Sequence, residues 1–171
     1  QAAWVSATNL TGMDFPFDAL AAADIQHQQA ERWCRWWASV PGDNAPDDVL
    51  ALLRGTDLYE RERGVRALGA LGGNGAALEI HRVIASYLPE VNVTPAEETL
   101  VQAGLRSLGR LRHPASLALL VDFLENQQWA RYAADALGDY GDDDAATALI
   151  AGYPRYGRDL QGERPKVYPE D

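Results

Sequence analysis

One motif occurs three times in this chain and constrains its fold more than any other feature. Residues 64–71 read Gly-Val-Arg-Ala-Leu-Gly-Ala-Leu and residues 104–111 read Gly-Leu-Arg-Ser-Leu-Gly-Arg-Leu. Residues 133–140, Ala-Ala-Asp-Ala-Leu-Gly-Asp-Tyr, form a looser third copy. Repetition on this scale is typical of stacked supersecondary units, and it predicts a solenoid.

The Leu-Gly pairs fix the register of the repeat. Their glycines stand at positions 69, 109 and 138, which gives steps of 40 and 29 residues. An aliphatic residue follows each glycine after eleven residues, at Ile80, Leu120 and Leu149. The shorter step fits two helices joined by tight turns, and the longer one contains an inserted loop. The chain therefore predicts an all-α superhelix of helix–turn–helix units.

Apolar residues recur at helical spacing in the first helix of each unit, at Val65, Leu68 and Leu71, and again at Leu105, Leu108 and Leu111. The second helices carry further apolar residues, among them Leu78, Ile84 and Leu120. Glycine inside a helix costs roughly 1 kcal/mol relative to alanine. The glycines that recur in register therefore predict close approach of a neighbouring helix.

One helix start is marked by a capping box. Thr94 is expected at the N-cap and Glu97 three residues later, with Pro95 between them at the first helical position. The second helix of the preceding unit is expected to follow a turn at residues 72–75.

The first 45 residues do not repeat, and they predict a helical cap rich in tryptophan. A helix is expected from about Ala19 to Ala38. Trp33 and Trp37 stand one turn apart, so they are expected to be buried on one face together with Cys34, whereas Trp36 is expected to be exposed. The predicted organisation is a cap over 1–45, repeats over 46–153 and a polar extended tail over 154–171.

Charge and cysteine content exclude several classes of function. The formal net charge is −10, which opposes binding to nucleic acid or to anionic membranes. A single cysteine, Cys34, excludes an internal disulfide framework and a cysteine-based zinc site. No stretch reaches the roughly 18 apolar residues of a membrane span.

No catalytic or metal-binding motif is recognisable. The three histidines, His27, His81 and His113, are scattered, and they do not supply a metal-ligand set. The acidic turn that contains Asp142 and Asp143 lacks the EF-hand pattern and fits a helix cap. We therefore predict no catalysis, no metal and no cofactor.

The densest basic residues lie in the repeats; they are Arg61, Arg63, Arg66, Arg106, Arg110 and Arg112. Arg66 and Arg106 are equivalent, with Arg110 one turn further on, so they are expected to follow one ridge. They form either a structural ladder that bonds the next unit or an anchor for an acidic partner. The residues expected to bind a partner are Arg66, Arg106, Arg110, Trp36, Tyr156 and Tyr168. The predicted function is a non-catalytic scaffold, or an accessory subunit of a larger complex, that binds another protein through the concave face.

Over residues 47–152 the chain resembles HEAT-like repeats of the bilin-lyase type. The resemblance rests on Arg-Ala-Leu-Gly at 66–69 and Arg-Ser-Leu-Gly at 106–109, and Asp135 departs from it in the third copy. It implies an alternative function, a bilin-lyase-like enzyme or chaperone acting on a client protein. Such an enzyme would need a deep pocket with converging carboxylates.

The segment Leu-Thr-Gly-Met-Asp-Phe-Pro-Phe-Asp at 10–18, followed by Glu-Arg-Trp at 31–33, is similar to a segment found beside HEAT repeats in bacterial, planctomycete-like proteins. Many of those proteins are exported. The resemblance implies a bacterial source and an extracytoplasmic location.

Overall fold

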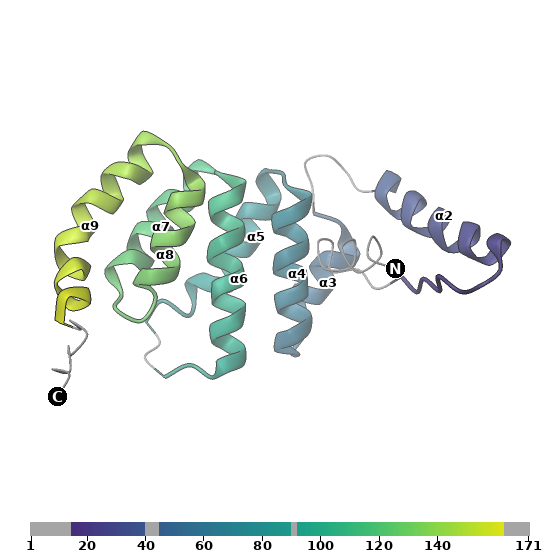
Figure 1. Ribbon diagram of the computed structural model, residues 1–171, viewed down its shortest axis with the longest axis horizontal. Helices are drawn as coiled ribbons and strands as arrows, with labels where there is room; N and C mark the ends of the chain where they lie inside the picture. Colours follow the sequence, from purple (N-terminus) through teal and green to yellow (C-terminus); the bar gives the residue numbers. More distant parts are fainter. Residues whose placement is uncertain (1–14, 40–44, 90–91, 163–171) are drawn as a thin grey trace, which may run out of the picture.

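The described part of the chain is all-helical. The computed structural model describes residues 15–39, 45–89 and 92–162 (Figure 1). No strand occurs among these residues. Their helices are α2 (Ala23–Ser39), α3 (Asp47–Arg54), α4 (Leu58–Leu71), α5 (Asn74–Ala85), α6 (Pro95–Leu111), α7 (Pro114–Glu125), α8 (Ala130–Tyr140) and α9 (Asp143–Gly162).

The repeats stack as two layers. Helices α4, α6 and α8 carry the three copies of the motif and pack side by side, with α6 in contact with both neighbours (Figure 1). Helices α5 and α7 lie behind them, and α9 packs on α8 and α7. Three units of two helices each, α4–α5, α6–α7 and α8–α9, follow one another. This arrangement confirms the predicted α-solenoid.

The core lies between the layers and uses the predicted apolar positions. Val65 and Leu68 of α4 are fully buried, as are Leu105 and Leu108 of α6. The eleventh residue after each motif glycine is fully buried at Ile80 and Leu120 and half-buried at Leu149. Leu78 is the exception, because it is 44 % exposed. Its side chain lies at the surface of α5.

The predicted capping box is present at the start of α6. The amide of Thr94 donates to Glu97 Oε2 at 2.8 Å, and the Glu97 amide donates to Thr94 Oγ1 at 3.4 Å. Pro95 is the first residue of the helix. The reciprocal bonds satisfy amides that have no partner inside a helix.

In two of the three copies a neighbouring helix approaches the motif glycine closely, as the repetition predicts. A Cβ on Gly69 would lie 2.3 Å from Ser107 Oγ, and a Cβ on Gly109 would lie 2.3 Å from the Ala136 carbonyl oxygen. A Cβ on Gly138 would have nothing within 4 Å. Gly138 belongs to the third copy, and among the described residues no further helix packs against its face.

The N-terminal helix is shorter than predicted and stands apart from the layers (Figure 1). It begins at Ala23 rather than Ala19, because the residues before it form a turn in which the Leu20 amide donates to Asp18 Oδ1. No residue of α2 is fully buried. The short helix α3 packs on α4 and closes the N-terminal end of the repeats.

The end of the chain also differs from the prediction. Helix α9 continues through Pro154 to Gly162, so residues 154–162 are helical rather than extended. Residues 163–171 lie outside the described residues.

Candidate functional site

A groove runs between α4 and α6 on the layer that carries the repeated motif. Its volume is about 300 Å³. Arginines border it on both helices, and small and hydroxyl residues form its floor; its lining includes Arg66, Gly69, Gln102, Arg106, Ser107 and Arg110. The predicted Arg66, Arg106 and Arg110 are thus brought together.

The groove exists because its floor residues are small. Gly69 has no side chain, and Ser107 of α6 packs directly on it. Ala70 and Ala103 also line the groove. The backbones of α4 and α6 therefore approach closely while the longer arginine side chains stand above them at the rim.

The three arginines differ in their partners. Arg66 is exposed, and its Nε lies 2.5 Å from Oε1 of the buried Glu62, one turn earlier on the same helix. Arg106 and Arg110 are exposed, and neither forms an ion pair or a hydrogen bond with any residue that the structure describes. These two guanidinium groups are available to a carboxylate or phosphate, which arginine binds with paired donors.

Two other arginines form hydrogen bonds between helical elements. The Nη1 of Arg61 donates to the hydroxyl of Tyr87 at 3.5 Å, which links α4 to the end of α5. The Nε of Arg112 donates to the carbonyl oxygen of Asp139 at 3.3 Å and links α6 to α8. Arg112 therefore links one unit to the next and Arg61 links the two helices of one unit, whereas Arg66 bonds a carboxylate of its own helix.

A polar cluster supports the edge of the groove. The hydroxyl of Tyr132 on α8 donates to Glu98 Oε1 at 2.8 Å, and Gln102 Nε2 donates to the same oxygen at 3.3 Å. The bond to Glu98, together with burial, raises the pKa of Tyr132 above its usual value. Gln102 was not predicted as a site residue, although it stands one turn before Arg106 and shares its helical face.

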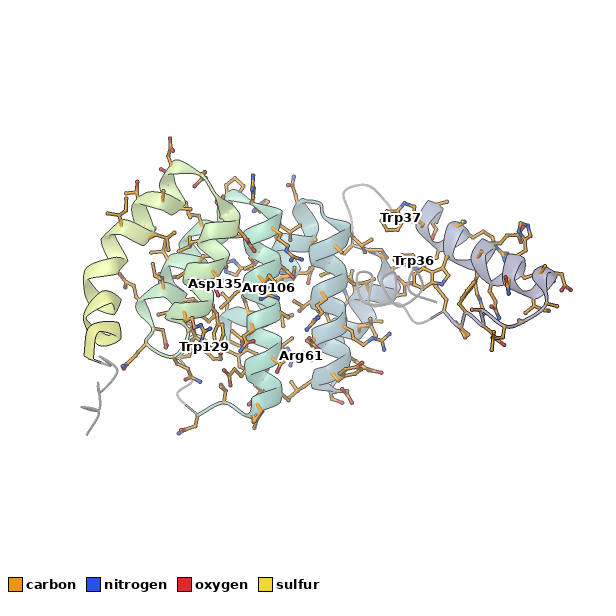
Figure 2. The ribbon with its side chains drawn as sticks, in the orientation of Figure 1. Trp36, Trp37, Arg61, Arg106, Trp129 and Asp135 are labelled. Atoms are coloured by element: carbon orange, nitrogen blue, oxygen red, sulfur yellow. The ribbon has the colours of Figure 1, made fainter. Side chains whose placement is uncertain are left out.

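Two of the three tryptophans of α2, Trp36 and Trp37, are arranged opposite to the prediction (Figure 2), whereas Trp33 is half-buried and packs edge-to-face against Phe15 and Trp36. Trp36 packs against the core, and its Nε1 donates to Asp48 Oδ2 of α3 at 2.6 Å. Trp37 is 59 % exposed and Cys34 is exposed. Trp36 therefore attaches α2 to the repeats, and the expectation that it is the exposed tryptophan is wrong.

The remaining predicted contacts fall outside what the structure describes. Tyr156 lies on α9, but its side chain is beyond the described ones, and Tyr168 lies outside the described residues. Over the described ranges, no three His, Cys, Asp or Glu side chains converge to hold a metal ion. None of the described helices is long and apolar enough to cross a membrane.

Comparison with known families identifies one repeat. The PBS lyase HEAT-like repeat family matches residues 129–153, which comprise Trp129, α8 and the first half of α9. No curated protein and no solved structure matches the chain. The match supports a HEAT-like repeat protein, in agreement with the two-layer fold.

Proposed function

We propose that this HEAT-like solenoid is a non-catalytic interaction scaffold that binds an acidic segment of another protein in the groove between α4 and α6. The observation that carries the proposal is the pair Arg106 and Arg110, which lie one turn apart, are exposed and have no partner in the described structure. The chain has a net charge of −10. The two unpaired arginines therefore give the groove a local positive charge on a protein whose net charge is negative.

The shape of the groove favours a polypeptide ligand over a small molecule. The groove is open and runs along two long helices, whereas small-molecule sites bury most of their ligand. Its arginine rim supplies directional donors, and its Thr99, Gln102 and Ser107 supply further polar groups. An acidic segment bound over α6 would place a carboxylate against one or both guanidinium groups.

The groove does not favour the alternative of a bilin-lyase-like enzyme. That alternative requires carboxylates that converge in a deep apolar pocket. No carboxylate is among the groove's lining residues, and its rim is basic. Membership of a larger complex is part of the proposal, because a solenoid of this kind works through its surface.

Affinity isolation from the native cells, followed by mass spectrometry, tests the proposal. We expect the wild-type chain to retain a companion protein, and the double variant R106E/R110E to lose it. The matched control is R32E/R35E, which makes the same change in charge on the exposed polar side of α2. Recovery of the same companion with R106E/R110E, or of no companion with the wild type, would contradict a groove-bound partner.

A further inference from the structure

The layer formed by α4, α6 and α8 carries a charge pattern that reverses between two of its helices. The reversal is meaningful only if equivalent residues of the three helices are also neighbours in space. The glycine contacts establish this point. Ser107 packs on Gly69 of the preceding copy and stands two residues before Gly109, the glycine of its own copy. In the same way, Ala136 packs on Gly109 and stands two residues before Gly138.

Because both steps use the same offset, residues three before each motif glycine form one row across the layer. That row is Arg66, Arg106 and Asp135. Residues one after each glycine form a second row, Ala70, Arg110 and Asp139. In both rows α6 carries an arginine and α8 an aspartate, and Figure 2 shows Arg106 and Asp135 at the same level of the two neighbouring helices. Arg112, at the end of α6, also lies beside Asp139, because its Nε donates to the Asp139 carbonyl oxygen at 3.3 Å.

The two charges of each row do not neutralise one another by direct pairing. Asp135 and Asp139 are exposed, and neither carboxylate forms an ion pair with a described residue. Arg131 lies one turn before Asp135 on α8, so the reversal is confined to the two rows that contain Arg106 and Arg110. The layer therefore presents adjacent positive and negative strips to solvent.

We propose that the segment bound on this layer is bipolar, with an acidic side chain over Arg106 or Arg110 on α6 and a basic side chain over Asp135 or Asp139 on α8. Packed helix axes lie roughly 8–10 Å apart. A segment in the polyproline II conformation has three residues per turn and rises about 3.1 Å per residue, so side chains three residues apart share one face and lie roughly 9 Å apart. The acidic and basic side chains are therefore three residues apart in a polyproline II segment that crosses the two helices.

This inference rests on the proposed function, because it specifies the partner of the same surface. A uniformly acidic segment would bind at α6 and be repelled at α8. Opposite charges at both positions also fix the direction in which the segment crosses, since the reversed segment would place like charges together.

A library of random 12-residue peptides displayed on phage tests the proposal. The baits are the wild-type chain, R106E/R110E and D135R/D139R, each verified as folded by circular dichroism. We expect the wild type to enrich peptides with an acidic and a basic residue three positions apart. We expect D135R/D139R to enrich peptides with acidic residues at both positions.

The outcomes separate the two proposals. If the wild type enriches acidic peptides without a basic residue and D135R/D139R enriches the same ones, the bipolar partner is overturned and the acidic-segment scaffold stands. If R106E/R110E enriches the same peptides as the wild type, or no bait enriches any, both are overturned.

One enriched peptide, labelled with a fluorophore, gives a second measurement by anisotropy. We expect D135R to weaken its binding by at least about threefold, as loss and reversal of an exposed charge pair requires. The control D122R makes the same charge change on α7, outside the layer, at a residue that is also exposed. Equal affinity of D135R and D122R would overturn the contact with α8.

Discussion

Ser107 occupies the space in which a side chain at residue 69 would have to begin. A Cβ on Gly69 would lie 2.3 Å from Oγ and 2.6 Å from Cβ of Ser107. The Ser107 hydroxyl also donates to the carbonyl oxygen of Val65 at 3.4 Å. The contact therefore sets the spacing between α4 and α6, and with it the width of the groove.

The first prediction concerns the substitution Gly69→Ala. The added methyl group must displace Ser107 and its backbone, so we expect a loss of about 1–3 kcal/mol in the free energy of unfolding despite the better helix propensity of alanine. Gly138→Ala is the matched control, because it is the equivalent residue and has open space around it. It is expected to stabilise the protein by up to about 1 kcal/mol. Urea unfolding measures both, and equal effects would contradict the packing explanation.

The repeat made the fold predictable, but the ranking of its copies, in which the third was expected to resemble the family least, is not supported by the family match. The arginine-containing copies at Arg66 and Arg106 carry the resemblance, whereas the family match falls on residues 129–153. The unit before α6 contains the connection from Ser86 to Thr94, which lengthens its step to 40 residues. The unit at 129–153 has short connections and so fits a compact repeat.

The second prediction concerns acid stability and the capping box. The bonds from the Thr94 amide and hydroxyl lower the pKa of Glu97 below its ordinary value of 4.5. A carboxylate with a lowered pKa in the folded state stabilises that state above the unfolded pKa, and the contribution is lost as the pH falls through the folded pKa. The free energy of unfolding, measured in urea, should therefore differ less between pH 7 and pH 3 for E97Q than for the wild type.

Two variants delimit the prediction on Glu97. Thr94→Ala removes the N-cap and should cost about 0.5–2 kcal/mol at neutral pH. D122N, which removes an exposed carboxylate that caps no helix, is the matched charge control at both pH values. If the free energy of unfolding of E97Q changed between pH 7 and pH 3 as much as that of the wild type, Glu97 would not contribute to the acid sensitivity.

The third prediction concerns the link between α6 and α8. Tyr132→Phe removes the bond to Glu98 and should cost about 0.5–1.5 kcal/mol. The raised pKa of Tyr132 means that its protonated form stabilises the fold, so this contribution is lost as the pH rises through the folded pKa, above the ordinary 10.0. Absorbance titration of tyrosinate should show one late-titrating tyrosine fewer in Y132F. Tyr59→Phe, at a tyrosine that is 69 % exposed, should leave that tyrosine in place.

The fourth prediction concerns the attachment of α2. Trp36→Ala removes both the packing on the repeats and the bond to Asp48. Because α2 has no fully buried residue, we expect it to detach and trypsin to cleave at Arg32 and Arg35 faster, while the melting temperature of the repeats changes little. Trp37→Ala is the control and should leave the cleavage rate unchanged. Slow cleavage of W36A would show that other contacts hold α2.

The candidate site was only partly predictable, for a physical reason. Helical spacing placed Arg66 and Arg106 on one ridge, because equivalent residues of stacked units are neighbours. The same spacing could not decide which tryptophan of α2 is buried. That outcome depends on where α3 crosses, and the partner of Trp36 is Asp48, twelve residues further along the chain. Local periodicity contains no information about such a contact.

In the motif helices, the residues that determine packing differ from those that determine the surface charge. Gly69 with Ser107, and Gly109 with Ala136, fix the position of each helix through backbone and small side chains. Arg106 and Asp135, on the same helices, stand at the surface and form no ion pair or hydrogen bond with a described residue. Substituting these surface charges should therefore leave the packing of the helices unchanged. The charge preference of the binding surface can then change, in evolution or by design, without loss of the fold.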